Sequence, residues 1–315
     1  MALLVSLRPF ALTVPALTLT LALGAACGGK EEADPPPAEP VVDAGPVMSP
    51  PVDAGVPETI DAAVDAPFSM KTFRPSGKGL WIWTFDHAGM TPVEAATLAK
   101  QLGISYVLIK SGQDASFWPQ RFNASIVGEF VSRGIRVLAW PYITPAGGAA
   151  SIDAAAQAAL VPGCDGLVLD VEIEWEKGDN AAAAKTLCNG IRQKAPGVWL
   201  AYTSFGWAGF HTKFPFSTFD AECGDAAFPQ VYFSDRGVAW DSGLKQALDH
   251  YAAAGLKAPM WPITSNDNVL GTKVGPTTAS LNSFFDAAGP LTSLWVLTDV
   301  PAKRAQLPEL HWANP

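Results

Sequence analysis

The stretch GLVLDVEIEWE, residues 166 to 176, begins as an apolar run and ends with a carboxylate at every second position. The run GLVLDVEI indicates a β-strand, whose side chains alternate between two faces. A strand that is apolar on both faces is typical of a parallel sheet covered by helices on each side. The acids Asp170, Glu172, Glu174 and Glu176 therefore mark the carboxyl end of a buried strand.

Similar apolar runs recur along the chain, and each is followed by a segment with a helical pattern. The predicted strands are 80–85, 105–110, 136–143, 166–173, 198–204, 229–233, 259–264 and 293–298. Eight such units in about 245 residues predict a (β/α)8 barrel, a single α/β domain over residues 69–315. The alternative is an open doubly wound sheet, but no glycine-rich phosphate loop follows the first strand.

The helix predicted after the first strand shows its ends in the sequence. Thr91 is suited to the N-cap, Pro92 to the first helical position, and Glu94 to closing a capping box. Gly103 is the expected stop signal. The segment between Thr91 and Gly103 is therefore expected to be helical.

The carboxyl ends of the strands are where a barrel of this kind carries its functional groups. If the odd-numbered residues of 167–171 face the helices, Asp170 and Glu172 point together into the barrel mouth. Their carboxyl groups would then approach the separation of about 5 to 9.5 Å used by glycosidase acid and base pairs. Burial and mutual repulsion would raise the pKa of at least one carboxyl, as a proton donor at neutral pH requires. Glu174 and Glu176 are expected to lie at a solvated strand end.

Three short segments resemble a known family in the same order. GLVLDVE resembles the Asp-x-Glu strand 4 of (β/α)8 glycoside hydrolases, most nearly the family 25 (Chalaropsis-type) lysozymes, which cleave peptidoglycan between N-acetylmuramic acid and N-acetylglucosamine. YVLIKSGQD at 106–114 and LAYTS at 200–204 resemble strands 2 and 5 of that family. The resemblance implies that Glu172 is the general acid. It also implies that Asp170 orients a substrate N-acetyl group or stabilises the oxocarbenium-like transition state.

Two positions depart from the family pattern. The first strand of the family ends Gly-x-Asp-x-Ser, whereas GLWIW at 79–83 has Trp81 at the acidic position, with Asp86 as the nearest substitute. On strand 6, Gln230 and Tyr232 stand where the family supplies a further acid. A catalytically inactive barrel is therefore an alternative to an active one.

Aromatic residues in or just beyond the strands support a sugar ligand. Flat rings with a polar edge stack on sugar rings, while the sugar hydroxyls form hydrogen bonds. The aromatic residues predicted to bind substrate are Trp83, Trp140, Tyr142, Tyr202, Tyr232, Trp261 and Trp295. Asp86, Lys110 and Gln230 are predicted to contribute polar groups. Lys110 is expected to hold Asp170 ionised by a charge-assisted hydrogen bond.

The N-terminal part of the chain predicts export. Residues 1–27 contain a long apolar run with Arg8 as the only charge, which indicates a secretory signal. LGAACGGK resembles a bacterial lipoprotein cleavage site, which implies lipid attachment at Cys27 and a mature protein anchored to the membrane, facing the periplasm or the cell surface. Residues 28–68 are rich in Pro, Ala and Asp and predict a disordered spacer.

Charge and cysteine content narrow the classes of partner. The spacer carries nine acidic residues and one basic residue, and residues 1–27 carry Arg8. Of the net charge of −9, this leaves −2 for residues 69–315. Neither nucleic acid nor an anionic membrane surface is an expected partner. No cysteine or histidine spacing matches a metal site, so we expect no metal and no cofactor. Among Cys164, Cys188 and Cys223 one disulfide is expected, and the pair Cys164 and Cys188 is favoured.

Two functions from different classes follow. The first is an exported, lipid-anchored glycoside hydrolase that acts, as a monomer, on peptidoglycan or another polysaccharide by carboxylate acid and base chemistry. The second is an inactive carbohydrate-binding or envelope scaffold protein that keeps the barrel. The discriminating observation is whether the carboxyl groups of Asp170 and Glu172 face a common open cleft lined by aromatic residues.

Overall fold

The computed structural model describes residues 73, 75–266 and 275–313. The predicted signal with Cys27 and the predicted spacer lie outside the described residues. The strands are β1 (Gly79–Ile82), β2 (Tyr106–Gln113), β3 (Ser116–Phe117), β4 (Arg136–Tyr142), β5 (Gly166–Asp170), β6 (Leu200–Phe205), β7 (Ala227–Gln230), β8 (Ile263–Ser265) and β9 (Ser293–Trp295). The helices are α1 (Phe85–Ala88), α2 (Pro92–Leu102), α3 (Ala124–Val131), α4 (Gly148–Ala159), α5 (Ala181–Lys194), α6 (Phe216–Cys223), α7 (Trp240–Ala253), α8 (Thr278–Ala287) and α9 (Pro301–Gln306).

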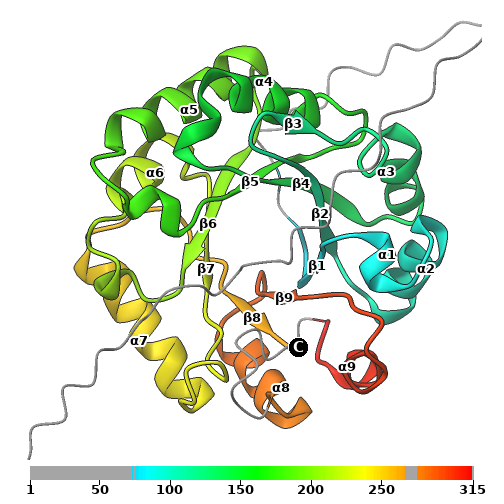
Figure 1. Cartoon of the computed structure of the whole chain (residues 1–315). Coiled ribbons are helices and arrows are strands. Elements are labelled where there is room, and N and C mark those ends of the chain that lie inside the picture. The colour runs from blue at the N-terminus through cyan, green and yellow to red at the C-terminus, as the bar shows by residue number, and fades with distance from the viewer. Residues whose placement is uncertain (1–72, 74, 267–274, 314–315) are drawn as a thin grey trace, which may run out of the picture. The chain divides into compact units, whose positions relative to one another are not determined.

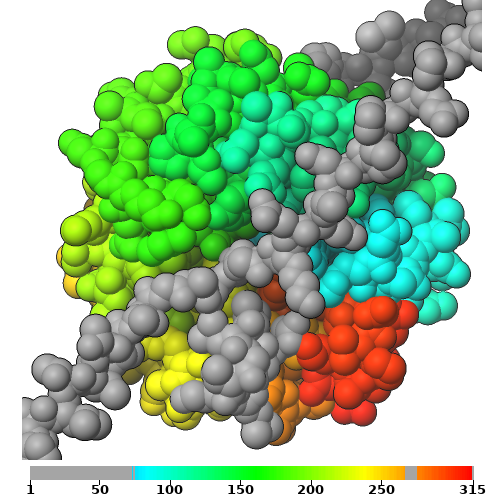
Figure 2. Space-filling model, in the orientation of Figure 1, coloured from blue at the N-terminus to red at the C-terminus, as the bar shows by residue number. Residues whose placement is uncertain are grey.

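All of these strands except β3 are parallel and form one closed barrel, with the helices outside it (Figure 1). The barrel closes at β1, which pairs with β2 along its whole length and with β9 at Gly79 and Leu80. In Figure 2 the first strand and helix unit accordingly lies beside the last one. The predicted (β/α)8 barrel is confirmed, and each predicted strand overlaps one of its eight parallel strands. The additional strand β3 forms an antiparallel hairpin with the end of β2.

Strand alternation divides the core into two clusters. The inner cluster fills the barrel and consists of Phe73, Trp81, Tyr106, Leu108, Leu138, Trp140, Val168, Trp199, Ala201, Ala226, Phe228, Trp261, Ile263 and Val296. The outer cluster lies between the strands and the helices and includes Leu167, Leu169 and Val171 from β5 and the residue after it. Because Val168 faces inward, Asp170 also faces inward at the end of the same strand.

Local sequence signals set the ends of α2 as expected. The Thr91 side chain accepts a hydrogen bond from the Glu94 backbone N–H, and the Glu94 carboxylate accepts one from the Thr91 backbone N–H. Gly103 ends the helix with a φ of 73°, a left-handed conformation that glycine adopts without strain. None of the described helices is both long enough and apolar enough to span a membrane.

The disulfide joins Cys188 on α5 to Cys223 at the end of α6. The favoured pairing of Cys164 with Cys188 is therefore wrong. Cys164 is buried just before β5, where its thiol donates to the carbonyl of Gly166. Cys188 lies on α5 and faces the neighbouring helix α6, which carries Cys223.

An aromatic floor closes the N-terminal end of the barrel. The Phe73 ring lies 4.9 Å from that of Trp199 and 5.9 Å from that of Trp261. The guanidinium of Arg136 lies 5.4 Å from the Phe73 ring and forms two hydrogen bonds with Asp165. Phe73 is 3% exposed, so the residue that leads into β1 is part of the core.

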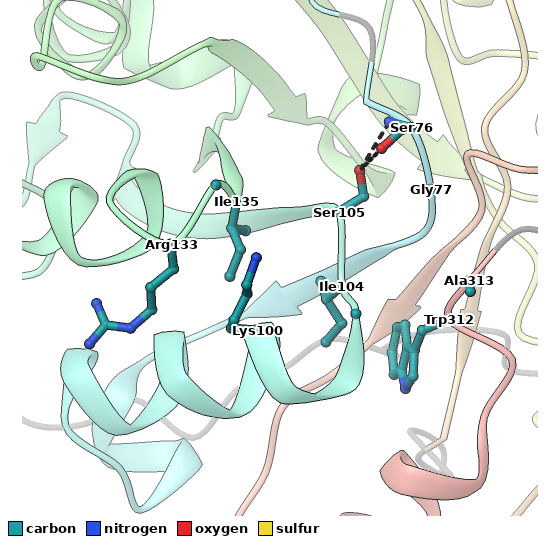
Figure 3. Close-up of a pocket in the computed structure, with 11 residues that line it drawn as sticks. Ser76, Gly77, Lys100, Ile104, Ser105, Arg133, Ile135, Trp312 and Ala313 are labelled. Atoms are coloured by element: carbon teal, nitrogen blue, oxygen red, sulfur yellow. Dashed lines mark hydrogen bonds between the residues drawn. The ribbon is translucent and has the colours of Figure 1, made fainter.

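A hollow of about 360 Å³ lies at this same end of the barrel (Figure 3). Its lining residues are Ser76, Gly77, Lys100, Gly103, Ile104, Ser105, Arg133, Gly134, Ile135, Trp312 and Ala313. Ser76 and Ser105 are joined by a hydrogen bond from the Ser76 backbone N–H to the Ser105 hydroxyl. The lining contains no carboxylate, and the hollow lies at the opposite end of the strands from Asp170.

Candidate functional site

The candidate site is built on the end of β5, where the strand delivers two carboxyl groups to the barrel mouth. Asp170 is the last residue of β5, and Glu172 follows after one outward-facing valine. The two side chains are each 8% exposed. The prediction that Asp170 and Glu172 share the inner face is therefore confirmed.

One amide group holds the two carboxyl groups together. Nε2 of Gln230, at the end of β7, donates to Oε1 of Glu172 over 2.9 Å and to Oδ1 of Asp170 over 3.4 Å. The same nitrogen lies 3.5 Å from Oγ1 of Thr203 on β6. The two strands that follow β5 in the barrel therefore fix the position of the acidic pair.

The surroundings of the acidic pair favour a protonated carboxyl group. Burial is the main cause that raises the pKa of Asp170 well above its ordinary value of 3.8, followed by the negative charge of Glu172. A hydrogen bond between the two carboxyl groups adds to this, while the positive charge of Lys110 acts in the opposite direction. Two carboxyl groups can be hydrogen-bonded only if one of them is protonated. One carboxyl group of the pair is therefore favoured in its protonated form, and the titrations of the two groups are linked.

Lys110 lies opposite the acidic pair in an aromatic cage. Its Nζ atom is 4.9 Å from the centre of the Trp140 ring, 5.4 Å from that of Trp118, and 5.9 Å from those of Trp83 and Tyr142. Ring faces attract a cation, most strongly where water is excluded, and Lys110 is 9% exposed. The cage therefore keeps a positive charge beside the acidic pair.

The two later acids of the opening stretch have different surroundings. Glu174 accepts a hydrogen bond from the Tyr142 hydroxyl over 2.7 Å, and burial together with this bond raises the pKa of Tyr142. A carboxylate oxygen of Glu176 lies 3.3 Å from Nδ1 of His211. The expectation of a simply solvated strand end is wrong for Glu174, whose negative charge also contributes to raising the pKa of Asp170.

Most of the predicted aromatic residues lie at or just below the mouth. Four of these residues are half-buried: Trp83, Tyr142, Tyr232 and Trp295. Three of the four, Trp83, Tyr232 and Trp295, pack on the inner cluster. Trp140 lies deeper and is buried, with its indole N–H donating to the carbonyl of Ile82. These five positions agree with an aromatic mouth.

Two aromatic predictions are wrong. Tyr202 faces outward from β6, is fully buried and stacks on Phe219 of α6 at a centroid distance of 5.8 Å. Trp261 precedes β8 and belongs to the floor, where it stacks on Trp199 at 5.3 Å. Neither ring can reach a ligand in the mouth.

The structure also accounts for the departure from the family pattern on the first strand. Trp81 is buried in the inner cluster, and its indole N–H donates to the hydroxyl of Ser293 on β9. Asp86 is exposed in the first turn of α1 and does not take the inward position that Trp81 occupies. In the described part of the chain, no group of three or more His, Cys, Asp or Glu side chains is arranged to hold a metal ion.

Trp118 is a residue of the site that the sequence did not reveal. It follows the hairpin of β2 and β3 and is half-buried, with its ring between the cations of Lys110 at 5.4 Å and Arg121 at 5.2 Å. Its backbone N–H donates to the carbonyl of Ser111. The nearest signal is the short run of aromatic residues around Phe117 and Trp118, which lies outside any predicted strand.

Comparison with known proteins identifies the class of fold. No protein-family model matches this chain, and no curated protein matches it. Among solved structures, the Bacillus cereus spore cortex-lytic enzyme SleL is similar over 76% of this chain and 75% of its own, with 12% identity and a TM-score of 0.52. Active domain 2 of a thermostable chitinase from Pyrococcus furiosus, solved with chito-oligosaccharides, is similar over 76% and 91%, again with 12% identity and a TM-score of 0.52.

A family 25 glycosyl hydrolase from Bacillus anthracis also matches, over 48% of this chain and 69% of its own, with 12% identity and a TM-score of 0.34. At these identities the matches establish the fold alone. The chain is a (β/α)8 barrel with distant structural matches among glycoside hydrolases.

Proposed function

We propose that this protein is a glycoside hydrolase that acts on a polysaccharide containing N-acetylated sugars, such as peptidoglycan. The observation that carries the proposal is the acidic pair at the carboxyl ends of the strands, held by Gln230 and faced by Lys110. The aromatic mouth supplies surfaces on which sugar rings stack. The resemblance of GLVLDVE to family 25 lysozymes and the chito-oligosaccharide bound to the chitinase both favour such a substrate.

The acidic pair provides the chemistry that glycoside cleavage requires. The proton of the pair passes from Glu172 to the oxygen of the leaving sugar as the glycosidic bond breaks. The negative charge that stays on the pair, next to Asp170, stabilises the oxocarbenium-like sugar or a substrate N-acetyl group that approaches it. A water molecule then adds to the anomeric carbon and returns a proton to the pair, which completes hydrolysis. Lys110 balances the charge of the pair before the reaction, so that only one proton is held.

A carbohydrate-binding protein without catalytic activity is the second candidate. Trp81 and Gln230 occupy positions where the resembled family has acids, and Trp81 is buried where no carboxylate can replace it. An aromatic mouth with a neutral amide still suits sugar binding. Hydrolysis therefore separates the two candidates.

We also propose that the protein is exported and anchored by a lipid at Cys27. The signal-like segment, the cysteine and the proline-rich spacer support this proposal. The disulfide between Cys188 and Cys223 agrees with an oxidising compartment outside the cytoplasm.

The test is to incubate the protein with purified peptidoglycan and a panel of polysaccharides and to detect new reducing ends by mass spectrometry. Glu172→Gln keeps the size of the side chain but removes its proton, so hydrolysis should fall by about 10²- to 10⁴-fold. Glu176→Gln is the matched control, because Glu176 pairs with His211 rather than with the acidic pair. If the wild type releases no product from any substrate, or if Glu172→Gln is as active as the wild type, the hydrolase proposal fails.

A further inference from the structure

Gln230 has a neutral side chain at the centre of an acidic site, and its two ends have different surroundings. The amide nitrogen is engaged with Glu172, Asp170 and Thr203. The hydroxyl of Thr203 already donates to the carbonyl of Phe228 over 2.8 Å. Thr203 can therefore only accept from Gln230, and all three groups around this nitrogen act as acceptors.

This arrangement fixes which way the amide points. An amide nitrogen carries two donors and the amide oxygen is only an acceptor, so the reverse orientation would place the oxygen against the acidic pair. The Oε1 atom must therefore point away from the carboxyl groups. Within the described part of the chain, no side chain or backbone group donates a hydrogen bond to this oxygen. The oxygen is also not among the fully buried atoms that lack a partner. Because Gln230 is half-buried, this oxygen can be reached from the carboxyl ends of the strands.

The backbone around Gln230 holds this orientation in place. Gln230 ends β7, with register partners Phe205 on β6 and Ile263 on β8. The next residue, Val231, donates its backbone N–H to the carbonyl of Ile263 over 2.8 Å. The oxygen is thus a preorganised acceptor on a central strand rather than on a loop, as a site that selects its ligand requires.

We infer that Gln230 determines specificity: its Oε1 atom accepts a hydrogen bond from a donor on the sugar unit that lies against Glu172. The donor is either the N–H of a 2-acetamido group or a ring hydroxyl, and both have the same chemistry at this oxygen. A sugar that presents only acceptors there, such as a uronic acid carboxylate, is rejected, because it meets both Oε1 and the negatively charged pair. The inference rests on the proposed carbohydrate site but not on its catalytic activity.

The experiment measures binding of chitotetraose and cellotetraose, which differ in the 2-substituent, to the full chain by calorimetry. Gln230→Met preserves length but removes both ends of the amide, so affinity should fall by about 2- to 12-fold, the worth of one neutral hydrogen bond. Gln230→Glu keeps an acceptor oxygen but loses the donors to the acidic pair, so it should retain more affinity than Gln230→Met. It should also shift the pH dependence of binding. Gln193→Met, at an exposed position on α5, is the matched control and should bind as the wild type does.

The two oligosaccharides distinguish the sources of the donor. A loss confined to chitotetraose identifies the acetamido N–H, and an equal loss for both identifies a hydroxyl. If folded Gln230→Met binds both oligosaccharides as tightly as the wild type, or if the wild type binds neither, the inference is overturned. Binding that depends on Gln230 in a protein that hydrolyses nothing leaves this inference standing and refutes only the proposed hydrolase.

Discussion

At the scale of single residues, the carboxyl group of Asp170 connects the fold to the chemistry of the site. The strand that carries it is buried, and burial together with Glu172 favours the protonated form. In the unfolded chain the same carboxyl ionises with an ordinary pKa of about 3.9. Holding the Asp170 carboxyl group in its protonated form therefore lowers the stability of the folded state at neutral pH.

Replacing Asp170 with Asn should remove this loss of stability at neutral pH. Because the folded pKa is raised, the contribution of Asp170 to the stability of the wild type is highest below about pH 4 and is lost as the pH rises through the folded pKa. Asp170→Asn lacks this titration, so its melting temperature relative to the wild type should rise between about pH 4 and neutrality. Each unit by which the fold raises the pKa corresponds to about 1.4 kcal/mol. Thermal unfolding from pH 3.5 to 8 measures the effect, with Asp86→Asn as the control for loss of a carboxylate. Parallel curves for Asp170→Asn and the wild type would contradict the prediction.

Gly206 is the residue that allows β6 and β7 to approach each other beside Gln230. A Cβ atom at this position would lie 2.4 Å from the backbone oxygen of Gln230, which cannot move without displacing the strand. Gly206→Ala should therefore destabilise the protein by about 1 to 3 kcal/mol. Gly128→Ala is the control, because Gly128 is exposed on α3 with open space around it and should gain about 0.5 to 1 kcal/mol. Denaturant unfolding compares the two, and equal stabilities would show that the strand ends can separate without loss.

At the scale of structural elements, each end of the barrel has its own role. The carboxyl ends of the strands carry the acidic pair, and the amino ends are closed by the aromatic floor around Phe73. Because Phe73 precedes β1, the segment that leads into the barrel contributes to its core. The boundary of the folding unit therefore lies before residue 73.

Removing the Phe73 ring should destabilise the barrel even though the residue lies in no strand. Phe73→Ala deletes contacts with Trp199, Trp261 and Arg136, and a buried Phe to Ala change costs about 3 to 5 kcal/mol. Deletion of residues 1–68 keeps this ring and should leave the melting temperature nearly unchanged. Phe210→Ala is the matched control, since Phe210 is 54% exposed. A Phe73→Ala variant as stable as the wild type would show that the floor does not contribute to folding.

At the scale of the whole molecule, charge and covalent chemistry separate the N-terminal segment from the barrel. Residues 28–68 hold most of the net negative charge, and residues 69–315 are close to neutral. A charged, proline-rich segment does not bury enough apolar surface to fold by itself. Its composition fits the proposed spacer between a lipid anchor and the barrel.

Replacing Cys27 with Ser tests the proposed anchor. Without the thiol no lipid can be attached, so the protein should leave the membrane fraction or accumulate as an uncleaved precursor. Fractionation of cells that express the wild type and Cys27→Ser measures this, and Cys164→Ser is the control for loss of a thiol elsewhere. Normal processing with unchanged membrane association of Cys27→Ser would exclude the lipid anchor.

The sequence by itself determined the barrel, because repeated apolar runs with helical segments between them have few other solutions. It also determined that Asp170 and Glu172 share one face, since strand alternation places the inner face at every second residue after Val168. It did not determine the orientation of Tyr202, because a strand buried on both faces is apolar on both and shows no alternation. Trp261 was predicted to lie at the barrel mouth, but it lies at the opposite end. The predicted strand 259–264 begins four residues before β8, so Trp261 precedes the strand instead of lying within it.

Only the tertiary structure decided which groups meet at the mouth. Gln230, Lys110 and Trp118 come from strands or loops far from β5 in the sequence, and no local pattern records their distances to Asp170. The pairing of Cys188 with Cys223 likewise depends on the packing of two neighbouring helices. Local signals arise from short-range geometry, whereas the contacts of Gln230 with the acidic pair, the aromatic cage and the disulfide arise from closure of the barrel, which brings distant segments together.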